Sequence, residues 1–99
     1  EINFSNIKFL PGAIELANDG IMPGGSKRNL EYSEEFVEFD SELSDLQKLL
    51  ACDAQTSGGL LISIPDDEAD EFIKALDSSS ASKIGNVINQ DSNIISVNP

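Results

Sequence analysis

The chain has 99 residues, of which 18 are Asp or Glu and 6 are Lys or Arg, so its net charge is −12. Binding to nucleic acid or to an anionic membrane surface needs clustered cations, and this composition argues against both classes of partner. No apolar run in the sequence is long enough to cross a membrane. A single cysteine, Cys52, and no histidine favour a protein of the reducing cytoplasm.

The size and apolar content predict one domain over residues 1–99. Hydrophobic residues make up 39% of the chain, which is enough for a single core. The sequence starts at Glu1 and enters an apolar alternation at once. We therefore expect it to be a fragment or an excised domain of a longer protein.

The first third predicts a strand followed by two helices. Ile2 and Phe4 alternate with polar residues, which favours a short strand. A helix is predicted from residue 10 to just before Gly20, because apolar residues recur there at helical spacing and Gly20 follows as a C-terminal stop. Ser26 is expected to cap a second helix that runs to residue 32.

The middle of the chain predicts a short strand, a helix and a longer strand. The strand covers residues 36–39, and either Asp40 or Ser41 caps a leucine-striped helix. The apolar run Leu60–Ile64 follows a glycine-rich turn and suits a central strand of a sheet.

The last third predicts a helix and a hairpin. Asp66 or Asp67 caps the helix, residues 78–82 form a serine-rich link, and strands at 83–88 and 93–97 flank a turn. Together the elements predict an α+β fold, with a small mixed sheet and helices packed on it. The acidic stretches 31–45 and 66–77 are expected to be solvated helix faces.

Self-contained catalytic chemistry is not predicted. Without histidine there is no Ser-His or Cys-His pair. Cys52 is either a thiolate nucleophile or an inert buried thiol, and its place after the leucine-striped helix favours the second. The segment Gly20–Lys27 has the glycine spacing of a phosphate loop, but its lysine follows the serine, which is the wrong order. The carboxylates lack the spacing of a calcium loop.

Two segments combine backbone freedom with polar groups. Pro23–Asn29 carries two adjacent cations, and Gln55–Gly59 places hydroxyl and amide groups before the apolar run Leu60–Ile64. Ligands often bind at such a strand end in α/β proteins. Tight turns with packing roles explain the two segments equally well.

Three blocks in this order resemble the C-terminal domain of the selenophosphate synthetases (selenide, water dikinases). They are Leu10–Ala17, Pro23–Leu30 and Asp53–Ile62, and the resemblance covers essentially the whole chain. Ala54 stands where the family often has proline. The resemblance implies the fold of the C-terminal domain of proteins similar to aminoimidazole ribonucleotide synthetase.

The resemblance also implies an activity for a longer protein. Members of the family convert selenide, ATP and water to selenophosphate, AMP and phosphate, with magnesium, and the whole enzyme is expected to be a homodimer. Their reactive Cys or selenocysteine, essential Lys and magnesium-binding aspartates lie in an N-terminal ATP-binding domain, which is the expected partner of this chain. No catalytic, cofactor-binding or metal-binding residue of the family is therefore assigned here, and the chain alone is expected to be structural and inactive.

Seven residues remain as candidates for contacts with the rest of such an enzyme. Thr56, Ser57, Gly58 and Gly59 are expected to line the cleft, and Lys27, Arg28 and Asn29 to stabilise a loop or a domain contact. The alternative function is a stand-alone α+β module that regulates or binds another protein. The resemblance also implies that the family's C-terminal domain begins with a helix upstream of this sequence. Its absence is expected to leave one sheet face partly uncovered, which would reduce stability or cause self-association.

Overall fold

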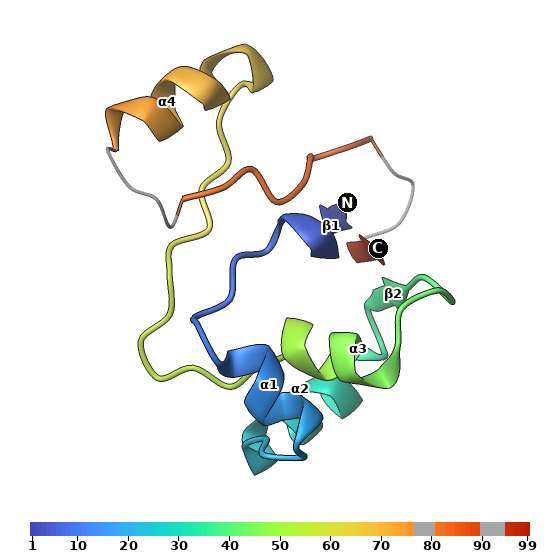
Figure 1. Ribbon diagram of the computed structural model, residues 1–99. Helices are drawn as coiled ribbons and strands as arrows, with labels where there is room; N and C mark the ends of the chain where they lie inside the picture. Colours follow the sequence, from blue (N-terminus) through green and yellow to red (C-terminus); the bar gives the residue numbers. More distant parts are fainter. Residues whose placement is uncertain (77–80, 90–94) are drawn as a thin grey trace.

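A computed structural model describes residues 1–76, 81–89 and 95–99 of the chain. Three helices lie together on one side of a small three-stranded sheet (Figure 1): α1 (Ala13–Asn18), α2 (Gly24–Ser33) and α3 (Asp45–Ala51). The predicted α+β class is confirmed.

The sheet is built around its last strand. It consists of β1 (Ile2–Asn3), β2 (Val37–Phe39) and β3 (Ile95–Asn98), in the order β1-β3-β2 with both pairings parallel. Val97 of β3 lies opposite Ile2 on one side and Phe39 on the other, and only 4% of its surface is exposed. The predicted strands near residues 2 and 36–39 are therefore confirmed, and β3 is the central strand.

Residues 84–86 lie antiparallel to β1 along its other edge. The Asn3 N–H donates to the Ile84 carbonyl (2.7 Å), and the Asn86 N–H donates to the Glu1 carbonyl (3.0 Å). A Cβ on Gly85 would overlap that Glu1 carbonyl, so this approach requires glycine. This antiparallel contact is an isolated bridge beside a sheet whose own two pairings are both parallel.

The predicted hairpin between residues 83–88 and 93–97 is wrong. β3 pairs with β1 and β2, whereas residues 84–86 contact the opposite edge of β1. Alternating apolar residues indicate a strand but not its partner, and the burial of Val97 is achieved between two other strands. Residues 90–92 of the expected turn and 78–80 of the serine-rich link lie outside the described residues.

The segment Leu60–Ile64 is not the central strand that the sequence predicts. It is extended and pairs with no described strand, and the side chains of Leu60 and Leu61 are 90% and 81% exposed. A strand is stable only with a hydrogen-bonding neighbour and a covered face, and the described residues give this segment neither.

Glycine sets both ends of α1. Gly12 has φ +85° immediately before the helix, and Gly20 has φ +79° just after it, conformations that favour glycine. The helix thus ends where the sequence predicts but starts three residues later than residue 10. Leu10 lies outside it and is 82% exposed.

The caps of α2 and α3 differ from the predicted ones. α2 begins at Gly24 after Pro23, so Ser26 lies inside the helix and is not its cap. α3 is capped by Ser44, whose side chain and that of Gln47 form a reciprocal capping box. This arrangement replaces the expected cap at Asp40 or Ser41, because only Ser44 has a glutamine three residues later.

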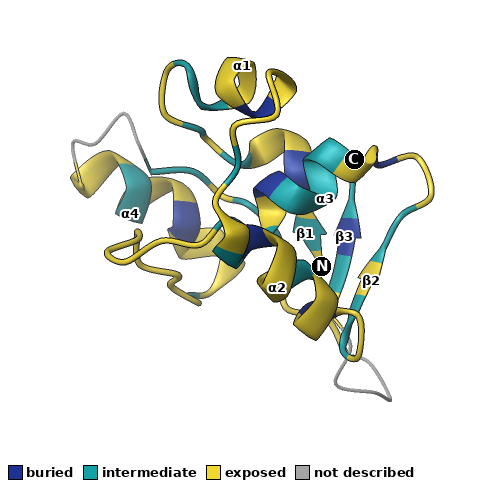
Figure 2. Ribbon diagram, turned by 90° about the horizontal axis from the view of Figure 1, so that it is seen from below, coloured by how far each residue is buried: buried dark blue, intermediate teal, exposed yellow. Residues whose placement is uncertain are grey.

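The core lies where the three helices face the sheet, and the residues buried there are drawn dark blue in Figure 2. The buried apolar residues that form it are Phe4, Ala17, Leu43, Leu50 and Val97. This is a small core for 99 residues.

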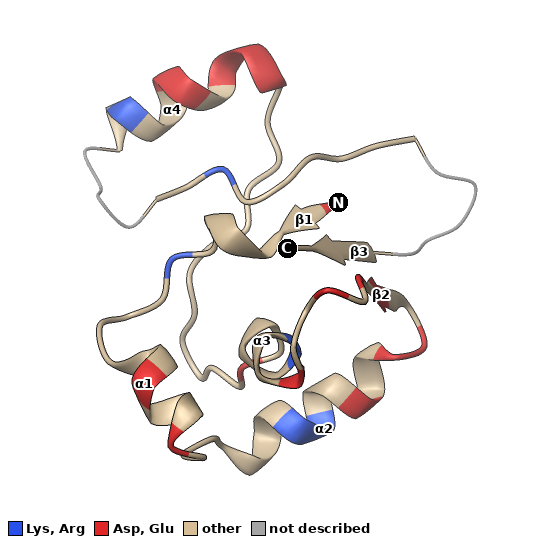
Figure 3. Ribbon diagram, turned by 45° about the vertical axis from the view of Figure 1, so that its right-hand side comes forward, with Lys and Arg blue, Asp and Glu red and all other residues tan. Residues whose placement is uncertain are grey.

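A second helix-containing segment lies apart from the core (Figure 1). The short 3-10 helix η2 (Asp66–Glu68) leads into α4 (Ala69–Ala75), which confirms the predicted helix. The predicted cap is wrong, because Asp66 and Asp67 lie within η2 and neither helix is capped by a side chain at its N-terminus; Asp66 instead forms an ion pair with Lys83. The acids of η2 and α4 are exposed, and Figure 3 shows their positions as red stretches of the ribbon. No helix in the described part of the chain has the length and apolarity needed to span a membrane.

Candidate functional site

The segment Pro23–Asn29, which the sequence singles out, contacts residues 52–54 at a junction between α2 and the chain that leaves α3. The second such segment, Gln55–Gly59, follows directly after these residues. Ser26 is fully buried there. Its hydroxyl donates to the Asp53 carboxylate (3.0 Å) and accepts from the Ala54 N–H (3.2 Å). One hydroxyl therefore satisfies a side-chain acceptor and a main-chain donor, and it fixes residues 53–54 to the helix.

Close backbone approach at the junction depends on Gly25. A Cβ at this position would lie 2.7 Å from the Cβ of Ala54, which is closer than two carbon atoms can approach without displacement. A Cβ added at Gly24, one residue earlier, would have only the flexible end of the Arg28 side chain nearby, at 3.7 Å. The two glycines therefore have different structural roles.

Two further residues of α2 bind the same stretch of chain. The Asn29 amide donates to the Cys52 carbonyl (3.1 Å), and the Ser33 hydroxyl lies 3.6 Å from the Cys52 sulfur. With Ser26 they occupy positions i, i+3 and i+7, which share one face of a helix. The Asn29 contact joins α2 to the end of α3, and a role of Asn29 in a loop or domain contact stays a prediction.

The sequence reasoning missed Ser26, Ser33 and Asp53 as junction residues. The sequence predicts that Ser26 caps a helix, and it singles out Asp53 only as the first residue of the block Asp53–Ile62. The recurrence of small polar residues at 26, 29 and 33 is the signal that could have found this face of α2.

The other candidate residues are placed outside the junction. Lys27 and Arg28 are exposed on α2 (blue in Figure 3). Thr56, Ser57, Gly58 and Gly59 follow the junction and are all exposed. Gln55 lies between the junction and these exposed residues, and its side-chain amide donates to the second carboxylate oxygen of Asp53 (3.4 Å). Ser26 and Asn29 thus join Pro23–Asn29 to residues 52–54, immediately before Gln55–Gly59, and the cations Lys27 and Arg28 take no part in these bonds.

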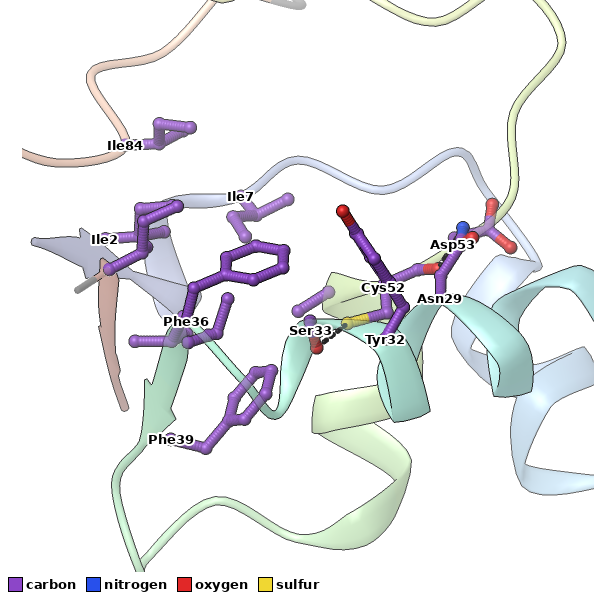
Figure 4. Close-up of a pocket in the computed structure, with 14 residues that line it drawn as sticks. Ile2, Ile7, Asn29, Tyr32, Ser33, Phe36, Phe39, Cys52, Asp53 and Ile84 are labelled. Atoms are coloured by element: carbon purple, nitrogen blue, oxygen red, sulfur yellow. Dashed lines mark hydrogen bonds between the residues drawn. The ribbon is translucent and has the colours of Figure 1, made fainter. Parts of the chain in front are cut away.

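An open pocket of about 440 Å³ lies next to the junction, between the sheet and α2 (Figure 4). Tyr32, Cys52 and Asp53 line one end, and Ile2 and Ile84 line the other. Cys52 is half-buried, with the Ser33 hydroxyl as its neighbour. The lining is mostly apolar and aromatic, which suits packing more than binding of a charged group.

The described residues contain no group of three His, Cys, Asp or Glu side chains that could hold a metal ion. The junction supplies one carboxylate, Asp53, which is already bonded to Ser26 and Gln55. Its geometry is that of a structural contact.

Comparison with curated proteins identifies relatives across nearly the whole sequence. A selenide, water dikinase of Aliarcobacter butzleri (strain RM4018) is 44% identical over 100 residues, which cover 98% of this chain and 29% of the relative. One from Campylobacter jejuni (strain RM1221) is 43% identical over 97 residues, covering 96% of this chain and 27% of the relative. One from Yersinia pestis is 40% identical over 93 residues, covering 92% and 26%.

The chain is homologous to selenide, water dikinases. The resemblance drawn from Leu10–Ala17, Pro23–Leu30 and Asp53–Ile62 is thereby confirmed. The homologous segment spans less than a third of each of these selenide, water dikinases. No family model matches the chain, and no solved structure matches it.

Proposed function

We propose that this chain is the C-terminal domain of a selenide, water dikinase, an enzyme that makes selenophosphate from selenide, ATP and water and releases AMP and phosphate. The observation that carries the proposal is 44% identity over 98% of the chain to a protein of that name. This identity favours the enzyme over a stand-alone regulatory or protein-binding module.

The role proposed for the chain within the enzyme is structural. Phosphoryl transfer depends on metal ions and cations that neutralise phosphate charge, whereas this chain has a net charge of −12. Its described carboxylates do not gather into a metal site, and Asp53 is engaged within the junction. The described residues of this chain do not fit a magnesium-ATP site. We therefore propose that magnesium and ATP bind to an N-terminal domain of the whole enzyme, and that this enzyme is cytoplasmic and dimeric.

A chimera tests this proposal. The matching segment of the Aliarcobacter butzleri relative is replaced by this chain, and selenide-dependent release of AMP from ATP is measured. We expect activity from the chimera, and none from the relative cut short of the segment or from this chain alone. A folded chimera without activity would contradict the assignment, and micromolar binding of magnesium-ATP by the chain alone would contradict its structural role.

We also propose that Thr56–Gly59 borders the active-site cleft of the whole enzyme. The support is that these residues are exposed and are held close to α2 by the Ser26–Asp53 contact. In the chimera, Thr56→Ala is expected to lower turnover by about 3-fold to 10-fold, the effect of one hydrogen bond. Arg28→Ala, which removes an exposed cation of α2, is expected to change the stability of the domain contact more than turnover. Unchanged turnover and nucleotide affinity in both variants would leave these residues with packing roles alone.

A further inference from the structure

The extended segment that joins α3 to α4 carries an apolar stretch with no neighbour. Leu60 and Leu61 are 90% and 81% exposed, and Ile62 is 49% exposed. Successive side chains of an extended chain point to opposite sides, so apolar groups are bare on both sides of this segment. Its main chain from residue 57 to 64 makes no hydrogen bond with any other described residue.

The sequence of this segment is that of a buried strand. Leu60–Ile64 is an almost continuous apolar run, bounded by Gly58-Gly59 before it and by Pro65 after it. Such runs occur where both faces of a sheet are covered. Free N–H and C=O groups beside apolar side chains also form a template for another strand. The buried strand that this sequence predicts is compatible with its exposed position only if another strand pairs with it.

The chain as a whole exposes more surface than its size requires. Its accessible surface is 7544 Å², whereas a compact protein of 10.6 kDa exposes about 5,500 Å². Its radius of gyration is 14.4 Å, against about 13 Å for a compact domain of 100 residues. An excess of about 2,000 Å² is on the scale of a permanent contact.

The rest of the enzyme is a better pairing partner for Leu60–Ile64 than a second copy of this chain. Each copy has a net charge of −12, so two copies repel one another. More than two thirds of the Aliarcobacter butzleri relative lies outside the homologous segment, which supplies ample chain for the missing strand. We propose, on the basis of the proposed function, that Leu60–Ile64 pairs as a β-strand with a strand from the part of the enzyme that this chain does not span.

This pairing would also place Thr56–Gly59 at the start of a strand within a covered sheet. The exposed hydroxyls and glycine N–H groups would then lie at the edge of the contact between the two parts of the enzyme. The pairing thus accounts for the exposure of both the apolar segment and the polar turn before it.

Hydrogen–deuterium exchange tests the pairing directly. The amides of residues 60–64 are compared in this chain alone and in the chimera with the Aliarcobacter butzleri relative. We expect fast exchange in the chain alone and exchange slowed by about 100-fold or more in the chimera, since paired strand amides open only rarely. Fast exchange in an active chimera would overturn the pairing. Slow exchange in the chain alone, with a dimer mass in sedimentation, would overturn it in favour of a second copy.

Two substitutions separate the pairing from general loss of stability. Leu61→Asp is expected to leave the melting temperature of the chain alone unchanged and to lower that of the chimera. Leu16→Asp, at a half-exposed position on α1, is the control and is expected to affect both proteins alike. Equal effects of Leu61→Asp on both proteins would overturn the pairing. An inactive chimera whose residues 60–64 are protected would count against the proposed function and support the strand.

Discussion

Replacement of Leu50 by alanine is expected to lower the free energy of unfolding by about 2–5 kcal/mol, the usual cost of emptying a buried leucine site. Leu50 is 7% exposed and packs in the core with Phe4, Leu43 and Val97. Because a chain of this size is stabilised by only about 5–15 kcal/mol, the loss would be a large fraction of the total. Urea unfolding followed by circular dichroism measures it.

The matched control is the same substitution at an exposed position. Leu60→Ala removes the same atoms from a side chain that is 90% exposed, and we expect a change within about 0.5 kcal/mol. Equal losses at the two positions would contradict the placement of the core. In the chimera the proposed strand pairing predicts that the cost at Leu60 rises towards that at Leu50.

The parts of the fold that the sequence predicted well depend on local physics. Gly20 ends α1 in a left-handed conformation, and the leucine stripe near residues 43–50 supplies core residues. The parts that it predicted wrongly depend on long-range partners. The alternation of apolar residues near Val97 predicts a strand but does not identify its two parallel neighbours. The apolar run Leu60–Ile64 predicts a buried strand, but periodicity carries no information about what covers it.

The candidate site shows the same division. The sequence singled out Pro23–Asn29 because it combines glycines with two adjacent cations, and Gln55–Gly59 because it combines glycines with hydroxyl and amide groups. It did not show that Ser26 binds Asp53, just before Gln55–Gly59, since that contact spans 27 residues and depends on how α2 packs against the end of α3. Residues chosen for their chemistry, Lys27 and Arg28, are exposed, whereas small residues form the contact.

The close approach of α2 to residues 53–54 leads to a prediction that two neighbouring glycines can test. Alanine is a better helix former than glycine, so Gly24→Ala is expected to raise the free energy of unfolding by about 0.4–1 kcal/mol. Gly25→Ala gains the same helical preference, but its new methyl group would lie 2.7 Å from the Cβ of Ala54. Overpacking of this kind costs about 1–3 kcal/mol, and we expect a net loss.

Displacement of α2 would also weaken the bonds that Ser26 makes to Asp53 and Ala54. Gly25→Ala should therefore speed amide exchange at Ala54, whereas Gly24→Ala should not. Stabilisation by both variants, with unchanged exchange at Ala54, would show that the helix and the turn are further apart than the structure places them. A loss confined to Gly25→Ala would tie Gly25 to the contact that precedes Thr56–Gly59, because an added methyl group meets the Ala54 Cβ at Gly25 and not at Gly24.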